Sequence, residues 1–187
     1  MRVNLSDPQR VRTPVRLGAP YLPRDIAASH PGTLDAKIHV DPGRLVTAFG
    51  AEGDQYYIVE RVDGQLVWSH MGPRANLFDD AGVLAGRHWN AKPGFPAWRV
   101  GHSQLSAQKD ASLPSARPVI DLPWLRLRTA TAGTGVLAGV TLIQRIHTRG
   151  GQPPVGRSFD EPDVKLRESD LGARVIVPYT ADYFFFR

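Results

Sequence analysis

Turn-forming residues recur along this chain at spacings too short for long helices. Its 187 residues include 18 glycines and 16 prolines. Proline removes a backbone donor and disrupts helix interiors, and glycine marks turns and bulges. Between the turns lie short runs of β-branched and aromatic residues, which fit a pleated, half-buried surface. The pattern predicts an all-β fold, either an antiparallel β-barrel or a two-sheet sandwich.

The predicted organisation is an irregular N-terminal arm, residues 1–34, followed by one β domain, residues 35–187. Prolines block a long helix in the arm, where Tyr21, Leu22 and Ile26 are candidates to dock on the domain. Asp63-Gly64 is the two-residue signal of a tight hairpin. With residues 50–54 as a loop, nine or ten short strands are expected, over 35–40, 44–49, 55–62, 65–70, 74–78, 83–89, 98–108, 124–128, 136–148 and 174–186.

Composition limits the partners and the compartment. The net charge of +5 and the pI of about 9.9 permit contact with an anionic surface, but the arginines are scattered and no run of four basic residues occurs. We therefore expect no nucleic-acid partner. No stretch approaches the roughly 18 apolar residues of a membrane span. The absence of cysteine excludes disulfides, and no signal peptide is seen, so a cytoplasmic location is expected.

Common catalytic and cofactor motifs are absent. Six histidines occur, but none shows the spacing of metal ligands, so no metal is expected. The run Gly133-Thr-Gly-Val-Leu-Ala-Gly139 looks like a dinucleotide loop, yet the residues after it form a strand pattern instead of the required helix. No Gly-x-Ser-x-Gly elbow is present. A protein without a cofactor is predicted.

Two runs near the C-terminus, residues 139–151 and 175–187, hold polar side chains among apolar ones. Alternate residues of a strand share a face, so Tyr179 is expected to lie with Tyr183, and Asp182 with Phe184. If the two runs are neighbouring strands, Arg145 is placed to pair with Asp182. Such a pair either fixes the register of the strands or belongs to a polar patch at a barrel mouth, and both interpretations stay open.

These residues motivate three functional hypotheses. The first is a pocket for an apolar or aromatic small molecule, lined by Gln144, Arg145, Tyr179, Trp98 and Trp124. The alternative is a cofactor-free biosynthetic enzyme, of the cyclase or isomerase type, that uses the same pocket with Asp182, His88 and Tyr179 as catalytic residues. The third is an interaction protein that uses the arm or a strand edge. A homodimer is left open.

The chain also resembles a known protein family over roughly residues 50–187. The resemblance is carried by the runs 63–68, 77–88, 122–125, 140–151 and 178–183, together with Trp98. In these the chain is similar to the DUF3455 family, whose function is uncharacterised. The resemblance implies a secreted or envelope location in many members, from which this chain departs because it shows no signal peptide. It supplies no catalytic residues.

Overall fold

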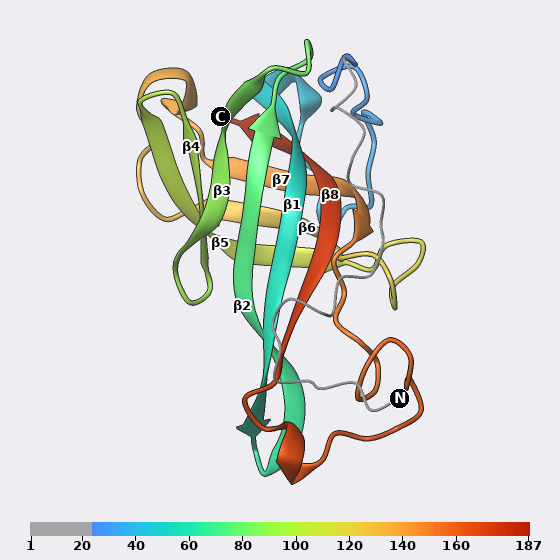
Figure 1. Cartoon of the computed structure of the whole chain (residues 1–187). Helices are drawn as coiled ribbons and strands as arrows, with labels where there is room; N and C mark the ends of the chain where they lie inside the picture. The colour runs from blue at the N-terminus through green and yellow to red at the C-terminus, as the bar shows by residue number, and fades with distance from the viewer. Residues whose placement is uncertain (1–23) are drawn as a thin grey trace.

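The computed structural model describes residues 24–187, which form a closed antiparallel barrel whose eight strands follow one another in chain order (Figure 1). The all-β prediction is confirmed, and of its two forms the barrel is correct. The strands are β1 (Leu45–Val62), β2 (Gln65–Phe78), β3 (Leu84–Lys92), β4 (Phe95–Val100), β5 (Ser103–Leu113), β6 (Trp124–Thr129), β7 (Leu142–Gly150) and β8 (Arg174–Phe186).

Two local predictions about pairing are confirmed. The β1–β2 hairpin turns at Asp63 and Gly64, which adopt φ values of 49° and 78°, as a tight turn between twisted strands requires. The last two strands, β7 and β8, are antiparallel neighbours, and β8 closes the barrel by pairing with β1 on its other side.

Several predicted strand limits are wrong, mainly because glycine was interpreted as a break. Residues 50–54 continue β1: a Cβ atom on Gly53 would lie 2.2 Å from the carbonyl oxygen of Arg74, so glycine allows β2 to approach closely. β2 likewise runs unbroken from 65 to 78. By contrast, the predicted strand 98–108 is divided by a turn at Gly101, where φ is 55°.

Of two other expected strands, one is absent and one begins later. Residues 35–40 form turns instead of a strand, with the amides of Ile38 and His39 both bonded to the carbonyl of Asp35. The run that starts at residue 136 first makes a 3₁₀ turn, Gly135–Leu137, and β7 begins only at Leu142. The described chain thus has eight strands instead of nine or ten.

Strand alternation sorts the apolar side chains into an interior and an outer layer. In β8, Tyr179, Ala181, Tyr183 and Phe185 belong to the interior cluster, while Phe184 and Phe186 belong to the outer one. The interior cluster also holds residues from the other strands and loops, namely Phe49, Ala51, Ala75, Leu77, Trp98, Leu105, Ala107, Leu122, Leu127, Leu137, Val140 and Ile143.

The segment 24–40 covers the outer layer. Ile26, Ile38 and Val40 are buried against Phe184 and Phe186. This confirms the predicted docking of Ile26; Tyr21 and Leu22 lie outside the described residues. None of the helices in residues 24–187 has the length and apolar character needed to cross a membrane.

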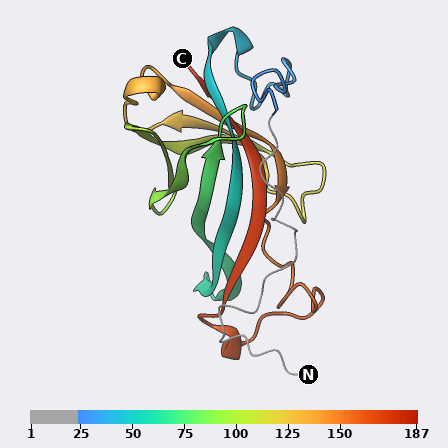
Figure 2. The ribbon, with the colours of Figure 1, turned by 45° about the horizontal axis from the view of Figure 1, so that its top comes forward.

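Beyond the barrel, β1, β2 and β8 extend together at the end where the loop 152–172 lies (Figure 2). Tyr57, Val175 and Val177 form a third apolar cluster there, with Trp68 and Phe159 against it. The indole of Trp68 donates to the carbonyl of Gly156 at 3.0 Å, which ties the loop to the sheet.

Candidate functional site

One row of inward-facing residues crosses the barrel wall from β8 to β5. Consecutive cross-strand partners run from Tyr179 through Gly53, Ala75, His88 and Trp98 to Leu105. Residues paired in this way point to the same face of a sheet. Gly53 and Ala75 are the small members of this row, between Tyr179 on one side and His88 and Trp98 on the other.

The aromatic side chains of this row pack closely with Tyr183. The imidazole of His88 stacks on the indole of Trp98, with ring centroids 4.6 Å apart and planes 11° from parallel, and it lies 4.9 Å from the ring of Tyr183. Burial lowers the pKa of His88 to about 3. A neutral His88 therefore donates through Nδ1 to the carbonyl of Ala97 at 2.8 Å, and its Nε2 is left as an acceptor.

Tyr179, Tyr183 and Arg145 bring hydroxyls and a cation into the interior. Arg145 on β7 is the cross-strand partner of Tyr183 on β8. Tyr179 lies on the same inward face of β8 as Ala181 and Tyr183. Burial raises the pKa of both tyrosines. The two hydroxyls lie close enough to perturb each other, and Arg145 lies close enough to Tyr183 to oppose part of the rise in its pKa, yet neither hydroxyl makes a well-formed hydrogen bond. Both phenols are thus neutral hydrogen-bond donors at physiological pH.

The interior contains buried polar atoms that have no hydrogen-bond partner among the described residues. Each is a group able to donate, and almost all buried donors in folded proteins are paired. They come from four strands: Gln55 Nε2, Trp98 Nε1, Arg145 Nε, Tyr179 Oη and Tyr183 Oη. We call these five residues the interior donor set.

Arg145 gives the interior donor set a positive charge. Its guanidinium donates to the carbonyl of Pro123 at 2.9 Å, and it forms no ion pair with any carboxylate within residues 24–187. A cation withdrawn from water normally has a paired anion. The interior donor set is therefore both rich in donors and positive in charge.

Gln55 links the interior donor set to the surface. Its Oε1 lies 2.5 Å from Nε2 of His70, and His70 is exposed. Gln55 is itself buried, with a relative exposure of 1%. The contact with His70 thus connects the buried Gln55 to the protein surface.

The structure divides the residues predicted for the site into two groups. Arg145, Tyr179, Trp98 and His88 lie together inside the barrel. Gln144, Trp124 and Asp182 lie on the outer face, beneath or beside the segment 24–40. The three residues predicted as catalytic therefore do not converge, because Asp182 is on the opposite face of the sheet from Tyr179.

The predicted pairing of Arg145 with Asp182 is wrong. Adjacent residues of β8 point to opposite faces, so Tyr183, not Asp182, faces Arg145. Asp182 instead accepts from the two terminal guanidinium nitrogens of Arg24, Nη1 and Nη2, and from Nδ1 of His147 at 2.9 Å. A bulge in β7, where His147 has a φ of 51°, turns this histidine to the outer face.

The outer-face residues act as anchors for the segment 24–40. Burial by itself would raise the pKa of Asp182, but the hydrogen bonds from His147 and Arg24 outweigh it and lower the pKa below its ordinary value. Gln144 donates to the carbonyl of Ile38 at 2.6 Å and contacts the imidazole of His30 at 2.8 Å. These contacts hold the segment on the barrel.

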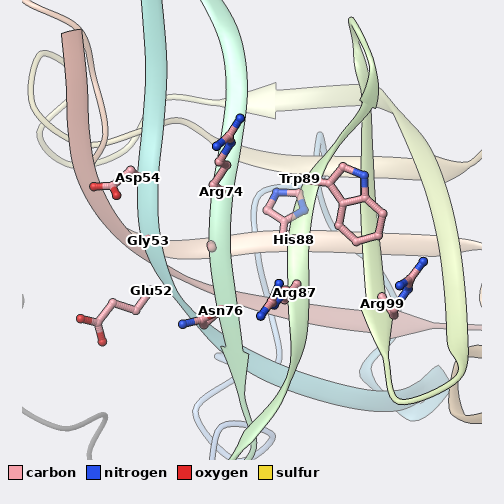
Figure 3. Close-up of a pocket in the computed structure, with 10 residues that line it drawn as sticks. Glu52, Gly53, Asp54, Arg74, Asn76, Arg87, His88, Trp89 and Arg99 are labelled. Carbon is pink, nitrogen blue, oxygen red and sulfur yellow. The ribbon is translucent and has the colours of Figure 1, made fainter. Parts of the chain in front are cut away.

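A separate groove lies on the outer face of β1 to β4 (Figure 3). Its volume is about 740 Å³. Gly53, Ala75 and His88, whose side chains belong to the inward row, complete a lining made mainly of outward-facing side chains: Glu52, Asp54, Arg74, Asn76, Arg87, Trp89 and Arg99. No group of three or more metal-ligating side chains is placed to hold a metal ion in the part of the chain that the structure describes.

Sequence reasoning missed Tyr183 and Gln55 as members of the interior donor set. The signal for Tyr183 was available, since it shares a strand face with Tyr179. Gln55 stands at the start of an apolar run and gives no comparable signal, because only the register of β1 with β8 shows that it points inward.

Comparison with known proteins gives one match. No curated protein and no solved structure matches the chain. The family model for a protein of unknown function, DUF3455, matches residues 41–187, which is most of the chain and includes all eight strands of the barrel. The chain therefore belongs to the DUF3455 family.

Proposed function

We propose that this barrel binds a small organic carboxylate, with its acid group on the interior donor set and its apolar or aromatic body among the interior side chains. The observation that carries the proposal is the group of five buried donor atoms without partners, Gln55 Nε2, Trp98 Nε1, Arg145 Nε, Tyr179 Oη and Tyr183 Oη.

The five unpaired donor atoms lower the stability of the ligand-free barrel. Leaving one buried donor unpaired costs about 1–3 kcal/mol, and more when the group is charged. Five such atoms together cost a large part of the stability of an ordinary domain, which is about 5–15 kcal/mol. A carboxylate supplies two oxygens with about four acceptor sites and one negative charge, so it suits Arg145 and the two phenols together.

The surroundings suit an apolar body. Phe185 and Trp98 approach with ring centroids 6.0 Å apart, and Tyr183 lies 5.5 Å from Trp98. Ligand sites are commonly apolar cavities with a few well-placed polar groups, and small barrels use their mouths in this way. The exposed His70 beside the buried Gln55 supports entry of the ligand at this end of the barrel.

The alternative of a cofactor-free cyclase or isomerase draws less support. Asp182 is held in ion pairs on the outer face, and His88, with a pKa of about 3, is a weak base at neutral pH. Tyr179 and Tyr183 remain suited to donating hydrogen bonds to a carbonyl or an enolate oxygen, which binding alone also uses.

The proposal is tested by thermal unfolding with octanoate and 2-naphthoate, against 1-octanol and 2-naphthol as neutral counterparts. A ligand that binds only the folded state stabilises it by about 2.7 kcal/mol at a concentration one hundred times its Kd. We expect the carboxylates to raise the melting temperature and the alcohols to have much smaller effects.

Arg145→Gln is expected to remove most of the stabilisation by the carboxylates. Arg126→Gln is the matched control, because Arg126 pairs with Asp110 on the outer face of the neighbouring strand β6. Equal stabilisation of both variants by octanoate or 2-naphthoate, or no stabilisation of the wild type by either acid, would contradict the proposal.

A further inference from the structure

The groove on the outer face of β1 to β4 carries two rows of cross-strand partners. The first row runs Glu52, Asn76, Arg87, Arg99 and Gln104, and the second joins Asp54, Arg74 and Trp89. Each row alternates with the inward row that contains His88 and Trp98, so these side chains face outward. The groove is thus a surface feature, separate from the barrel interior.

Two arginines stand directly opposite each other in the first row. Arg87 on β3 is the cross-strand partner of Arg99 on β4, and like charges in this position destabilise a sheet. Their neighbours along the row are the neutral Asn76 and Gln104, and Arg99 donates to Oε1 of Gln104 at 2.8 Å. Neither arginine forms an ion pair with a carboxylate among residues 24–187.

The carboxylates of the groove lie at its other end. Figure 3 shows Glu52 and Asp54 on β1, directed away from the guanidinium groups of β3 and β4. Glu52 is half-buried, so this end of the groove is partly withdrawn from water, and the burial raises the pKa of Glu52. The charge along the groove therefore changes from negative at β1 to positive at β3 and β4.

Trp89 provides a flat surface beside the arginine pair. The guanidinium of Arg99 lies 5.8 Å from the centre of the Trp89 ring, and Arg74 lies 5.1 Å from the ring of Tyr56. These cation–π contacts hold Arg99 and Arg74 in place, which for Arg99 reduces the freedom that it loses on binding a ligand. A planar ligand ring placed next to Trp89 lies within reach of both Arg87 and Arg99.

We infer that this groove is a binding site for a phosphate monoester of a small planar molecule. A phosphate dianion matches the two opposed guanidinium groups in charge and accepts paired hydrogen bonds from them. The ring of the ligand lies over Trp89. The volume of about 740 Å³ falls in the range of small-molecule sites, about 300–1,000 Å³. The site does not depend on the function proposed for the barrel interior.

The experiment is an isothermal titration calorimetry measurement at low salt with phenyl phosphate, inorganic phosphate and phenol. We expect phenyl phosphate to bind more tightly than either of the others, and its affinity to fall as salt is added. Arg87→Gln and Arg99→Gln should each lower the affinity for phenyl phosphate about tenfold or more, because a hydrogen bond between charged groups is lost. Trp89→Ala should abolish the preference of phenyl phosphate over inorganic phosphate.

Two controls separate this site from other causes. Arg174→Gln changes an exposed arginine outside the groove lining, and Arg145→Gln changes the interior donor set; both should bind phenyl phosphate as the wild type does. The inference is overturned if Arg87→Gln and Arg99→Gln keep wild-type affinity, if Arg145→Gln alone loses it, or if the wild type binds none of the three probes.

Discussion

Replacing Trp98 with alanine is expected to lower the free energy of unfolding by about 3–5 kcal/mol, as for other large residues removed from a core. The indole of Trp98 is fully buried and lies in contact with the rings of His88, Tyr183 and Phe185. Its loss removes three aromatic contacts at once and leaves a cavity between β4 and β8. Chemical denaturation, followed by circular dichroism, measures the change.

Trp89→Ala is the matched control for this prediction. Trp89 precedes Trp98 on the neighbouring strand of the same hairpin, but it faces the outer groove and is only half-buried. Its replacement should cost about 1 kcal/mol or less, since it removes mainly a surface contact with Arg99. A larger loss for Trp89→Ala than for Trp98→Ala would mean that this hairpin faces the other way, because a slip of one residue exchanges the two faces.

The second large effect is a loss of stability at acid pH that is due to His88. Because burial lowers the pKa of His88 to about 3, the folded protein keeps this imidazole neutral, while the unfolded chain binds a proton below a pKa near 6.5. The unfolded state therefore binds more protons between these values, and stability falls as the pH falls from about 6.5 towards 3. At pH 4.5 the loss due to His88 amounts to about 2–3 kcal/mol.

The difference between wild type and His88→Asn isolates this contribution. Asparagine keeps a donor for the carbonyl of Ala97 but does not titrate, so the variant should lose less stability on acidification than the wild type does. The free energies of unfolding of the two proteins, measured from pH 7 to pH 4.5, should converge or cross. Parallel profiles would show that His88 is not held in its neutral form by burial.

Local alternation predicted much of the fold and part of the site. The run 174–186 forms one strand with Tyr179 and Tyr183 on one face and Asp182 and Phe184 on the other, because a pleated strand leaves no other choice. Glycine was less informative. Gly53 looks like a loop residue in the sequence, yet it lies within β1, where the approach of the neighbouring backbone excludes any side chain.

The composition of the site depends on how the barrel closes, which the sequence does not show. His88 and Trp98 meet Tyr183 across the interior although about ninety residues separate them in the chain. The partners of Asp182 could not be predicted from the sequence either. They depend on a bulge at His147 and on the docking of Arg24 from outside the barrel, and neither follows from a periodic pattern.

Three tyrosine-to-phenylalanine variants test whether the hydroxyls of Tyr179 and Tyr183 serve a ligand rather than the fold. In the ligand-free protein, Tyr179→Phe and Tyr183→Phe should each raise the free energy of unfolding by about 1 kcal/mol, because each removes an unpaired buried group. Tyr57→Phe should lower it by about 1 kcal/mol, since its hydroxyl donates to the carbonyl of Gly151 at 2.7 Å. If all three variants are destabilised alike, the interior hydroxyls are already paired within the protein, and the proposal that they bind a ligand is contradicted.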